Sequence, residues 1–147
     1  MNKCVVVIPI YKACPDWNEI ISFKQCIKIL YKHPICLVTH RDLDINYYLA
    51  ILKKSKTNYT VEYFDEHYFK NIIGYNQLLL SKLFYSRFNQ YNYMLVSQLD
   101  TYVFKDDLTY WCAQGYDYIG APWFENYGTF EEGNRLWRVG NGGLSLR

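Results

Sequence analysis

Residues 93–104 read YMLVSQLDTYVF, and this stretch decides the fold class. Its first four residues are apolar or aromatic, which is typical of a strand buried on both faces of a parallel sheet. Two polar residues, Gln98 and Asp100, follow at the carboxyl end of that run. Ligands of such sheets bind outside the carboxyl ends of the strands. The stretch therefore predicts both a central strand and the edge of the sheet where a ligand binds.

Strand-like and helix-like segments alternate along the rest of the chain. Apolar runs predict strands at 4–8, 35–38 and 59–64, and shorter strands at 117–119 and 136–139. Helices are predicted to follow the N-cap pair Asp16 and Glu19, to span 43–53, to follow Gly74, and to run from 106–107 to Ala113. This alternation predicts an α/β layer fold with a mainly parallel sheet.

Apolar spacing supports the first two of these helices. In the first helix the spacing of three and four residues makes one apolar face of Ile20, Phe23, Ile27 and Leu30. In the second, Leu43, Tyr47 and Ile51 stand four residues apart, which is typical of a helix.

Composition excludes several classes of protein. The 147 residues carry 19% aromatic and 20% charged residues, which argues against disorder. A net charge of +2 is far from the basic balance of a nucleic-acid binder, so no nucleic-acid partner is expected. No apolar run reaches the 18–20 or so residues of a transmembrane segment. The start of the chain does not resemble a secretory signal, and the five cysteines form no CxxC pair. We therefore expect a cytoplasmic protein with reduced thiols.

The segment after residues 93–96 has two interpretations. Residues two apart on a strand share a face, so Gln98 and Asp100 are predicted to point one way and Leu99 towards the core. Asp100 is then either an oxygen ligand of a divalent cation or the cap of a turn. The pattern leaves both open.

Three further segments carry candidate binding residues. Tyr75 and Asn76 follow Gly74 at a predicted helix start, where free N–H groups suit phosphate or sugar hydroxyls; Asn76 is equally a simple N-cap. Two glycines follow Asn141 and permit a close backbone approach to a ligand or a tight turn. Trp123 opens a loop and is either a platform for a sugar ring or a packing anchor.

Taken together, these segments carry a resemblance. The chain reads VVVIPIY at 5–11, GYNQLLLS at 74–81, YMLVSQLDTYVF at 93–104, WCAQGYDYIGAPW at 111–123 and GNGGLSLR at 140–147. The same motifs in the same order resemble an uncharacterised family of glycosyltransferase-like proteins, known as a domain of unknown function. The resemblance covers nearly the whole chain and implies a GT-A-like, Rossmann-like three-layer sandwich with a mainly parallel central sheet.

The resemblance also implies roles for particular residues. The donor, a nucleotide-sugar, would bind at the carboxyl edge of the sheet, and the acceptor is a glycan or another molecule. The residues on the acceptor side would be Trp123, Asn141, Gly142 and Gly143. Those on the donor side would be Pro9, Tyr11, Tyr75, Asn76, Gln98 and Asp100.

The sequence departs from the family pattern at the metal site. Gln98-Leu99-Asp100 stands where many GT-A enzymes carry Asp-x-Asp, so an amide replaces the first carboxylate and leaves Asp100 as the metal ligand. An amide oxygen ligates more weakly, which leaves dependence on a divalent cation, Mn²⁺ or Mg²⁺, open. Glu125, Glu131 and Glu132 are the candidates for a catalytic base, although a polar loop is an equally ordinary place for them.

Length has its own implication within this resemblance. In similar families an acidic segment follows the NGG strand, whereas this sequence stops at Arg147. We therefore expect residues 1–147 to be one glycosyltransferase-like domain, containing the donor part and the start of the acceptor part, truncated at its C-terminus.

Two other functions compete with glycosyl transfer. A non-catalytic nucleotide or carbohydrate binding module of the same fold is favoured by Gln98 and by the missing base. A nucleotidyltransferase would use a similar sheet but needs a glycine-rich loop after the first strand, and residues 11–15 contain no glycine.

Overall fold

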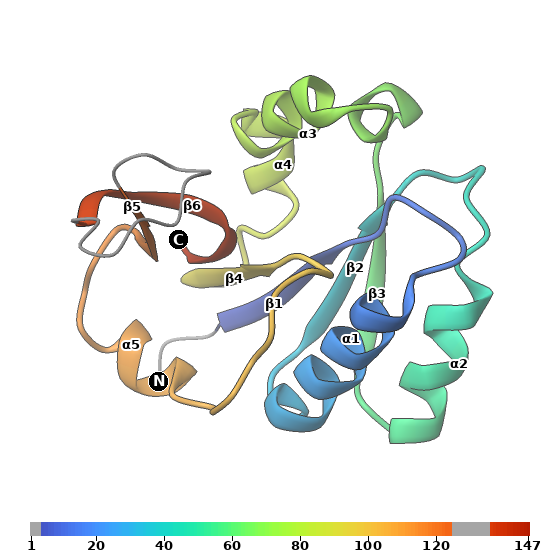
Figure 1. Ribbon diagram of the computed structural model, residues 1–147, viewed down its shortest axis with the longest axis horizontal. Helices are drawn as coiled ribbons and strands as arrows, with labels where there is room; N and C mark the ends of the chain where they lie inside the picture. The colour runs from blue at the N-terminus through green and yellow to red at the C-terminus, as the bar shows by residue number, and fades with distance from the viewer. Residues whose placement is uncertain (1–3, 125–135) are drawn as a thin grey trace.

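Six strands form one sheet in the order β3-β2-β1-β4-β6-β5 (Figure 1). The computed structural model describes residues 4–124 and 136–147. The strands are β1 (Cys4–Pro9), β2 (Ile35–Thr39), β3 (Tyr59–Tyr63), β4 (Tyr93–Ser97), β5 (Ile119–Phe124) and β6 (Leu136–Leu146). The strands predicted at 4–8, 35–38, 59–64 and 93–96 are confirmed as β1 to β4, and β1 lies between β2 and β4 near the middle of the sheet. Strands β1 and β2 are buried throughout, whereas β3 at the edge has no buried residue.

The sheet is mixed, which corrects the expectation of a mainly parallel one. The pairs β1·β2, β2·β3 and β1·β4 are parallel, whereas β4·β6 and β5·β6 are antiparallel. Residues 125–135 connect β5 to β6, and a parallel crossover takes roughly a dozen residues or more. So short a connection favours the antiparallel pairing of these two strands. Strand β6 therefore runs against its neighbours β4 and β5.

Helices cover both faces of the sheet, so the fold has three layers (Figure 1). The helices α1 (Trp17–Leu30), α2 (Asn46–Ser55) and α5 (Leu108–Cys112) contribute to one core. The 3-10 helix η1 (Glu66–Phe69) and the helices α3 (Ile72–Leu79) and α4 (Lys82–Ser86) pack on the other. Strand β1 alternates between them, with Val6 and Ile8 in the first core and Val5 and Val7 in the second.

The helix predicted over 43–53 is α2, which begins at Asn46 and is anchored by Tyr48. Tyr48 and Leu52 are fully buried, while Tyr47 is 43% exposed. The Tyr48 ring packs edge-on against Phe23 with ring centroids 5.2 Å apart. The Tyr48 hydroxyl also donates a hydrogen bond to the carbonyl of Lys12 at 3.0 Å. A buried phenol needs such a partner, and this bond selects Tyr48 as the inward residue.

The helix predicted to follow Gly74 is two helices, and the first begins before Gly74. The side chain of Asn71 caps α3 by accepting a hydrogen bond from the backbone N–H of Gly74, and Ser81 caps α4. A Cβ at Gly74 would lie 2.5 Å from the carbonyl oxygen of His67. Glycine is therefore required inside α3 because the helix lies directly against η1.

The remaining predictions concern the cysteines and the membrane. None of the five cysteines forms a disulfide, and Cys26 and Cys36 are buried in the core. Within the described ranges, the helices are all too short or too polar to cross a bilayer.

Candidate functional site

The chain reverses its direction of travel across the sheet at β1. It proceeds from β1 outward to β2 and β3, and then returns to the other side of β1 to form β4. Open α/β sheets bind ligands in the crevice outside the carboxyl ends of the strands at such a switch point. The segments at this crevice are the loop that follows Pro9 and the segment 98–101 that follows β4. Both contain residues predicted as candidates from the sequence.

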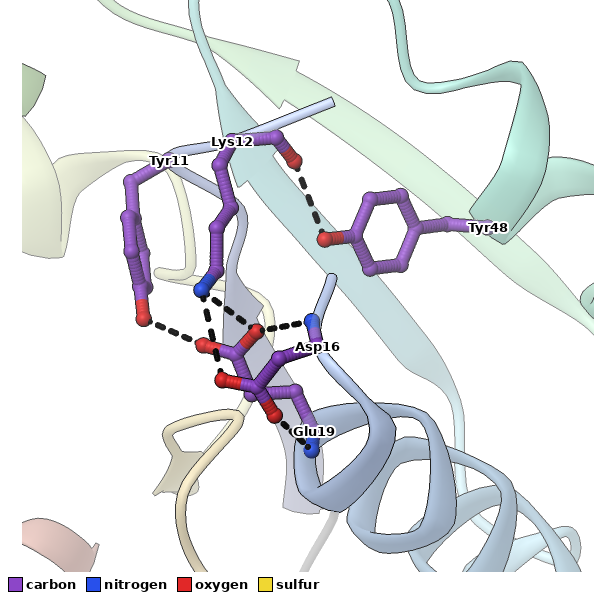
Figure 2. Close-up of polar contacts among 5 residues, drawn as sticks. All are labelled: Tyr11, Lys12, Asp16, Glu19 and Tyr48. Carbon is purple, nitrogen blue, oxygen red and sulfur yellow. Dashed lines mark hydrogen bonds and ion pairs between the residues drawn. The ribbon is translucent and has the colours of Figure 1, made fainter. Parts of the chain in front are cut away.

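The loop after β1 is organised by one buried carboxylate, that of Glu19 at the start of α1 (Figure 2). Glu19 is only 5% exposed. Its Oε1 accepts a hydrogen bond from the Tyr11 hydroxyl at 2.6 Å. Its Oε2 lies 2.6 Å from Lys12 Nζ and accepts the backbone N–H of Asp16 at 2.8 Å. Three donors from the loop therefore converge on a single side chain.

Electrostatic interactions fix the protonation states of Glu19, Lys12 and Tyr11. Burial by itself would raise the pKa of Glu19, but the bonds from Lys12, Tyr11 and Asp16 outweigh it and hold the pKa below its usual range. The bond to Glu19 raises the pKa of Lys12. Burial and the bond to Glu19 raise the pKa of Tyr11. At neutral pH the loop therefore contains a carboxylate anion, an ammonium cation and a protonated phenol.

A second side chain holds the same loop from the neighbouring helix. The Tyr48 hydroxyl of α2 bonds to the Lys12 carbonyl, as Figure 2 also shows. Asp16 completes the capping box of α1 by accepting the backbone N–H of Glu19 at 3.0 Å. The predicted cap is confirmed, since the two carboxylates accept the backbone N–H groups of Asp16 and Glu19. The loop is therefore fixed from both α1 and α2.

The segment after β4 is fixed mainly through Gln98. Its backbone N–H donates to the carbonyl of Gly143 on β6 at 2.8 Å, and its carbonyl accepts the Thr101 hydroxyl at 2.7 Å. Its side-chain Nε2 donates to the Tyr75 hydroxyl of α3 at 2.9 Å. Leu99 is 1% exposed and turns to the core as predicted. Asp100, next along the turn, is exposed.

The charge of Asp100 acts on Tyr75 of α3 and on Tyr11 of the loop after β1. Burial is the main cause that raises the pKa of Tyr75 to about 12, and the charge of Asp100 acts in the same direction. The charge of Asp100 also contributes to the raised pKa of Tyr11. The structure therefore gathers four of the predicted donor-side residues around one edge: Tyr11, Tyr75, Gln98 and Asp100.

The other two donor-side residues have different surroundings. Pro9 is the buried last residue of β1 and lies just before the loop that contains Tyr11. Asn76 follows Tyr75 on α3, about 100° further round the helix axis, and is exposed. Tyr75 and Asn76 lie inside α3 rather than in a turn before a helix, because Asn71 provides the cap. The helix N-terminus predicted for phosphate binding is therefore not at these residues.

The predicted acceptor-side residues lie on β5 and β6. Because Leu144 pairs with Ser97, residues 141–143 continue β6 beyond the carboxyl end of β4. The backbone of Asn141 pairs with Ala121, and that of Trp123 pairs with Arg138. The carbonyl of Gly143 accepts the backbone N–H of Gln98, so β6 contacts the segment that follows β4. The three base candidates, Glu125, Glu131 and Glu132, lie outside the described residues.

The side-chain oxygens at this edge are too few to hold a divalent cation by themselves, but they fit one whose coordination is completed by a bound phosphate ligand. Across residues 4–124 and 136–147 there is no group of three or more His, Cys, Asp or Glu side chains placed to hold a metal ion. Asp100 and the Gln98 side-chain oxygen are hard oxygen ligands. Mg²⁺ commonly binds through one or two carboxylates together with substrate phosphates.

Sequence reasoning missed the central part of the site, which is Glu19 with Lys12 and Tyr48. Glu19 was identified only as a partner in a helix cap. One signal was present: Glu19 stands four residues before Phe23, on the apolar face of α1 that also carries Cys26 and Leu30. A charged residue on an apolar face requires a partner, and the residues following β1 provide it.

The comparison with protein families gives one match. The model of a family described as a protein of unknown function, DUF5672, matches residues 58–147. This span runs from β3 to β6 and includes Tyr75, Gln98, Asp100 and the glycines of β6. No curated protein and no solved structure matches the chain. Because the match covers more than half of the sequence, the chain belongs to the DUF5672 family of proteins of unknown function.

Proposed function

We propose that this chain is a glycosyltransferase domain of GT-A-like architecture that binds a nucleotide-sugar donor at the carboxyl edge of β1 and β4. One observation carries the proposal. Aromatic, amide and carboxylate side chains from three elements meet at the topological switch point of the sheet, namely Tyr11, Tyr75, Gln98 and Asp100. The motif resemblance over nearly the whole chain supports the same reading.

Two groups of side chains form this edge, and we call them its walls: Tyr11 in the loop after β1, and Tyr75 of α3 with Gln98 at the end of β4. The two walls suit different parts of a donor. Tyr11 is 48% exposed although its hydroxyl is bound to Glu19, so its ring is available for stacking. Tyr75 and Gln98 hold each other through the 2.9 Å hydrogen bond and so present a fixed polar wall. Asp100, two residues after Gln98 in the same segment, is an exposed carboxylate. A nucleoside diphosphate would lie across these walls with its phosphates towards Asp100.

A divalent cation is part of the proposal because the anionic donor would otherwise meet the charge of Asp100. Asp100 and the Gln98 side-chain oxygen would hold it together with the diphosphate oxygens. When bound, such a cation stabilises the negative charge of the departing diphosphate. We expect the cation to bind with the nucleotide and not before it.

The reaction that follows is transfer of a sugar. The bond from the anomeric carbon to the diphosphate oxygen breaks, and a bond to the acceptor hydroxyl oxygen forms. The proton of that hydroxyl passes to a carboxylate base, for which Glu125, Glu131 and Glu132 are the candidates, or to the departing diphosphate. The transition state is oxocarbenium-like, as in other glycosyl transfers. The side chains at the edge bind and orient the donor for this step.

Thermal unfolding with nucleotides tests the proposal. We expect at least one of UDP, GDP, ADP, CDP and TDP, added with Mn²⁺, to raise the melting temperature by several degrees. A ligand at about 100 times its Kd stabilises a protein by about 2.7 kcal/mol. Mn²⁺ alone should produce no comparable shift. Asp100→Asn should remove the nucleotide-dependent shift.

The matched control is Asp117→Asn. Asp117 is also exposed, but it precedes β5 and so lies at the opposite edge of the sheet, since β5 runs in the direction of β4. This variant should respond to the nucleotide as the unmodified chain does. A chain that responds to none of the five nucleotides with Mn²⁺ contradicts the proposal.

A non-catalytic nucleotide or carbohydrate binding module is the second candidate function. It is favoured by Gln98, whose amide nitrogen is engaged by Tyr75 at the position where a second carboxylate would strengthen a metal site. A module would bind the nucleoside diphosphate yet neither hydrolyse nor transfer the sugar of any nucleotide-sugar that competes with it. Chromatography of the reaction mixture distinguishes the two functions.

A further inference from the structure

We propose that Glu19 is the positioning residue of this edge: it fixes the Tyr11 ring and the Lys12 ammonium where the donor binds. The inference deepens the proposed function and rests on it for the identity of the ligand. Glu19 is distinct from the donor-side residues, because its buried carboxylate acts through the two side chains that it holds (Figure 2).

The bonds of Glu19 exceed what a helix cap requires. A capping box needs only the bond from Glu19 to the backbone N–H of Asp16, which is present at 2.8 Å. The carboxylate also bonds the Tyr11 hydroxyl and the Lys12 ammonium, each at 2.6 Å. A buried charge is costly unless it is paired and hydrogen-bonded. The burial of Glu19 therefore depends on the loop being held in this one arrangement.

The arrangement leaves specific parts of the loop for a ligand. The Tyr11 hydroxyl is committed to Glu19, while the residue stays 48% exposed. Lys12 Nζ lies 5.5 Å from the centroid of the Tyr11 ring and 3.6 Å from Asp16 Oδ2. The ring and the ammonium are thus fixed relative to each other, as preorganised binding groups must be.

A double-mutant cycle on Glu19 and Tyr11 tests this role. The full chain is prepared unmodified and as Glu19→Gln, Tyr11→Phe and the double variant. Calorimetry measures the Kd of the stabilising nucleoside diphosphate with Mn²⁺. We expect Glu19→Gln to weaken binding about tenfold, the effect of one charge-assisted hydrogen bond. In the Tyr11→Phe background the same substitution should have less effect, because one of the two groups through which Glu19 acts is gone.

A second measurement reports the position of Tyr11 without any ligand. In protein carrying ¹³C-labelled tyrosine, the Tyr11 ring signal is assigned by its loss in Tyr11→Phe. We expect a distinct shift in the unmodified chain and a shift averaged towards that of free tyrosine in Glu19→Gln. Ser81→Ala, which removes the cap of α4 and lowers stability comparably, should change neither the Tyr11 signal nor the Kd.

The outcomes separate the two proposals. A Tyr11 signal that is unchanged in Glu19→Gln overturns the positioning role, whether or not a nucleotide binds. A changed signal with an unchanged Kd overturns its relevance to the donor. A chain that binds no nucleotide contradicts the proposed function, and the ring signal still decides whether Glu19 positions the loop. If Glu19→Gln does not fold, Tyr11→Phe must by itself weaken nucleotide binding, and an unchanged Kd overturns the inference.

Discussion

The two walls of the switch-point edge are built in opposite ways. The loop after β1 is hydrogen-bonded to Glu19 of α1 and to Tyr48 of α2, and the carboxylate of Glu19 is buried. The segment after β4 is held by Gln98, and its carboxylate, Asp100, is exposed. In the first wall a buried charge provides rigidity, and in the second an exposed charge remains available to a ligand. Preorganised binding groups need support of the first kind.

The largest effect on the rigid wall is expected from Tyr48→Ala. This change removes a fully buried ring and its bond to the Lys12 carbonyl, so we expect a loss of about 3–5 kcal/mol in the free energy of unfolding. Urea titration followed by circular dichroism measures it. Tyr47→Ala, on the next and 43% exposed residue, should lose less than about 1 kcal/mol. Equal losses would show that the wall does not depend on Tyr48.

The support of the second wall should be sensitive to Gly74→Ala. The added Cβ would meet the His67 carbonyl at 2.5 Å, so α3 would have to move away from η1 and would carry Tyr75 with it. We expect a loss of about 3 kcal/mol in the free energy of unfolding. Asn76→Ala, at an exposed position of the same helix, is the control and should change stability little. An unchanged midpoint in Gly74→Ala would mean that the contact with η1 is not required.

The buried carboxylate of Glu19 predicts a pH dependence of stability. The pKa of Glu19 is lower in the folded chain than in the unfolded chain. Its contribution is therefore complete above the unfolded pKa of about 4.3 and is lost as the pH falls through the folded value. Glu19→Gln should lower the free energy of unfolding by about 1.5 kcal/mol at neutral pH. The difference from the unmodified chain should shrink as the pH falls below about 4. A difference that stays constant across this range contradicts the prediction.

The smallest effect is expected from Tyr75→Phe. The change removes the hydroxyl that accepts the bond from Gln98 Nε2 but keeps the ring, so stability should fall by about 1 kcal/mol or less. The informative measurement is nucleotide affinity, which should weaken because Gln98 loses its orientation. Tyr85→Phe, which removes a hydroxyl bonded to Arg147, is the matched control and should leave affinity unchanged.

Local patterns in the sequence were sufficient for much of the fold. Strands β1 and β2 are short apolar runs, and every residue of both is buried. Strand β3, whose residues only loosely alternate, lies at the edge of the sheet and has no buried residue. The cap of α1 was predicted because Asp16 and Glu19 are three residues apart, a spacing that determines the geometry by itself. The burial of Leu99 between two polar neighbours was predicted for the same local reason, although β4 ends before it, at Ser97.

What was missed depends on contacts between distant segments. The insertion of β6 between β4 and β5 is decided by pairing, and no periodicity in 136–146 indicates it. The start of α3 was misplaced because Gly74 resembles a helix boundary, whereas its role is to allow the helix to lie against η1. The importance of Glu19 depends on its contacts with the side chains of Tyr11 and Lys12, which the loop after β1 places beside it. The local pattern of Asp16 and Glu19 identifies Glu19 only as part of a helix cap.

The position of β6 has a consequence for folding during synthesis. Strand β4 pairs with β1 on one side, but on its other side it pairs with Leu144–Leu146 through residues 95–97. Until the ribosome has released that late segment, a central strand exposes an unpaired edge of backbone N–H and carbonyl groups. Open edges of this kind pair readily with other chains. Nascent chains of this protein are thus most prone to aggregate in the interval between the emergence of β4 and that of β6.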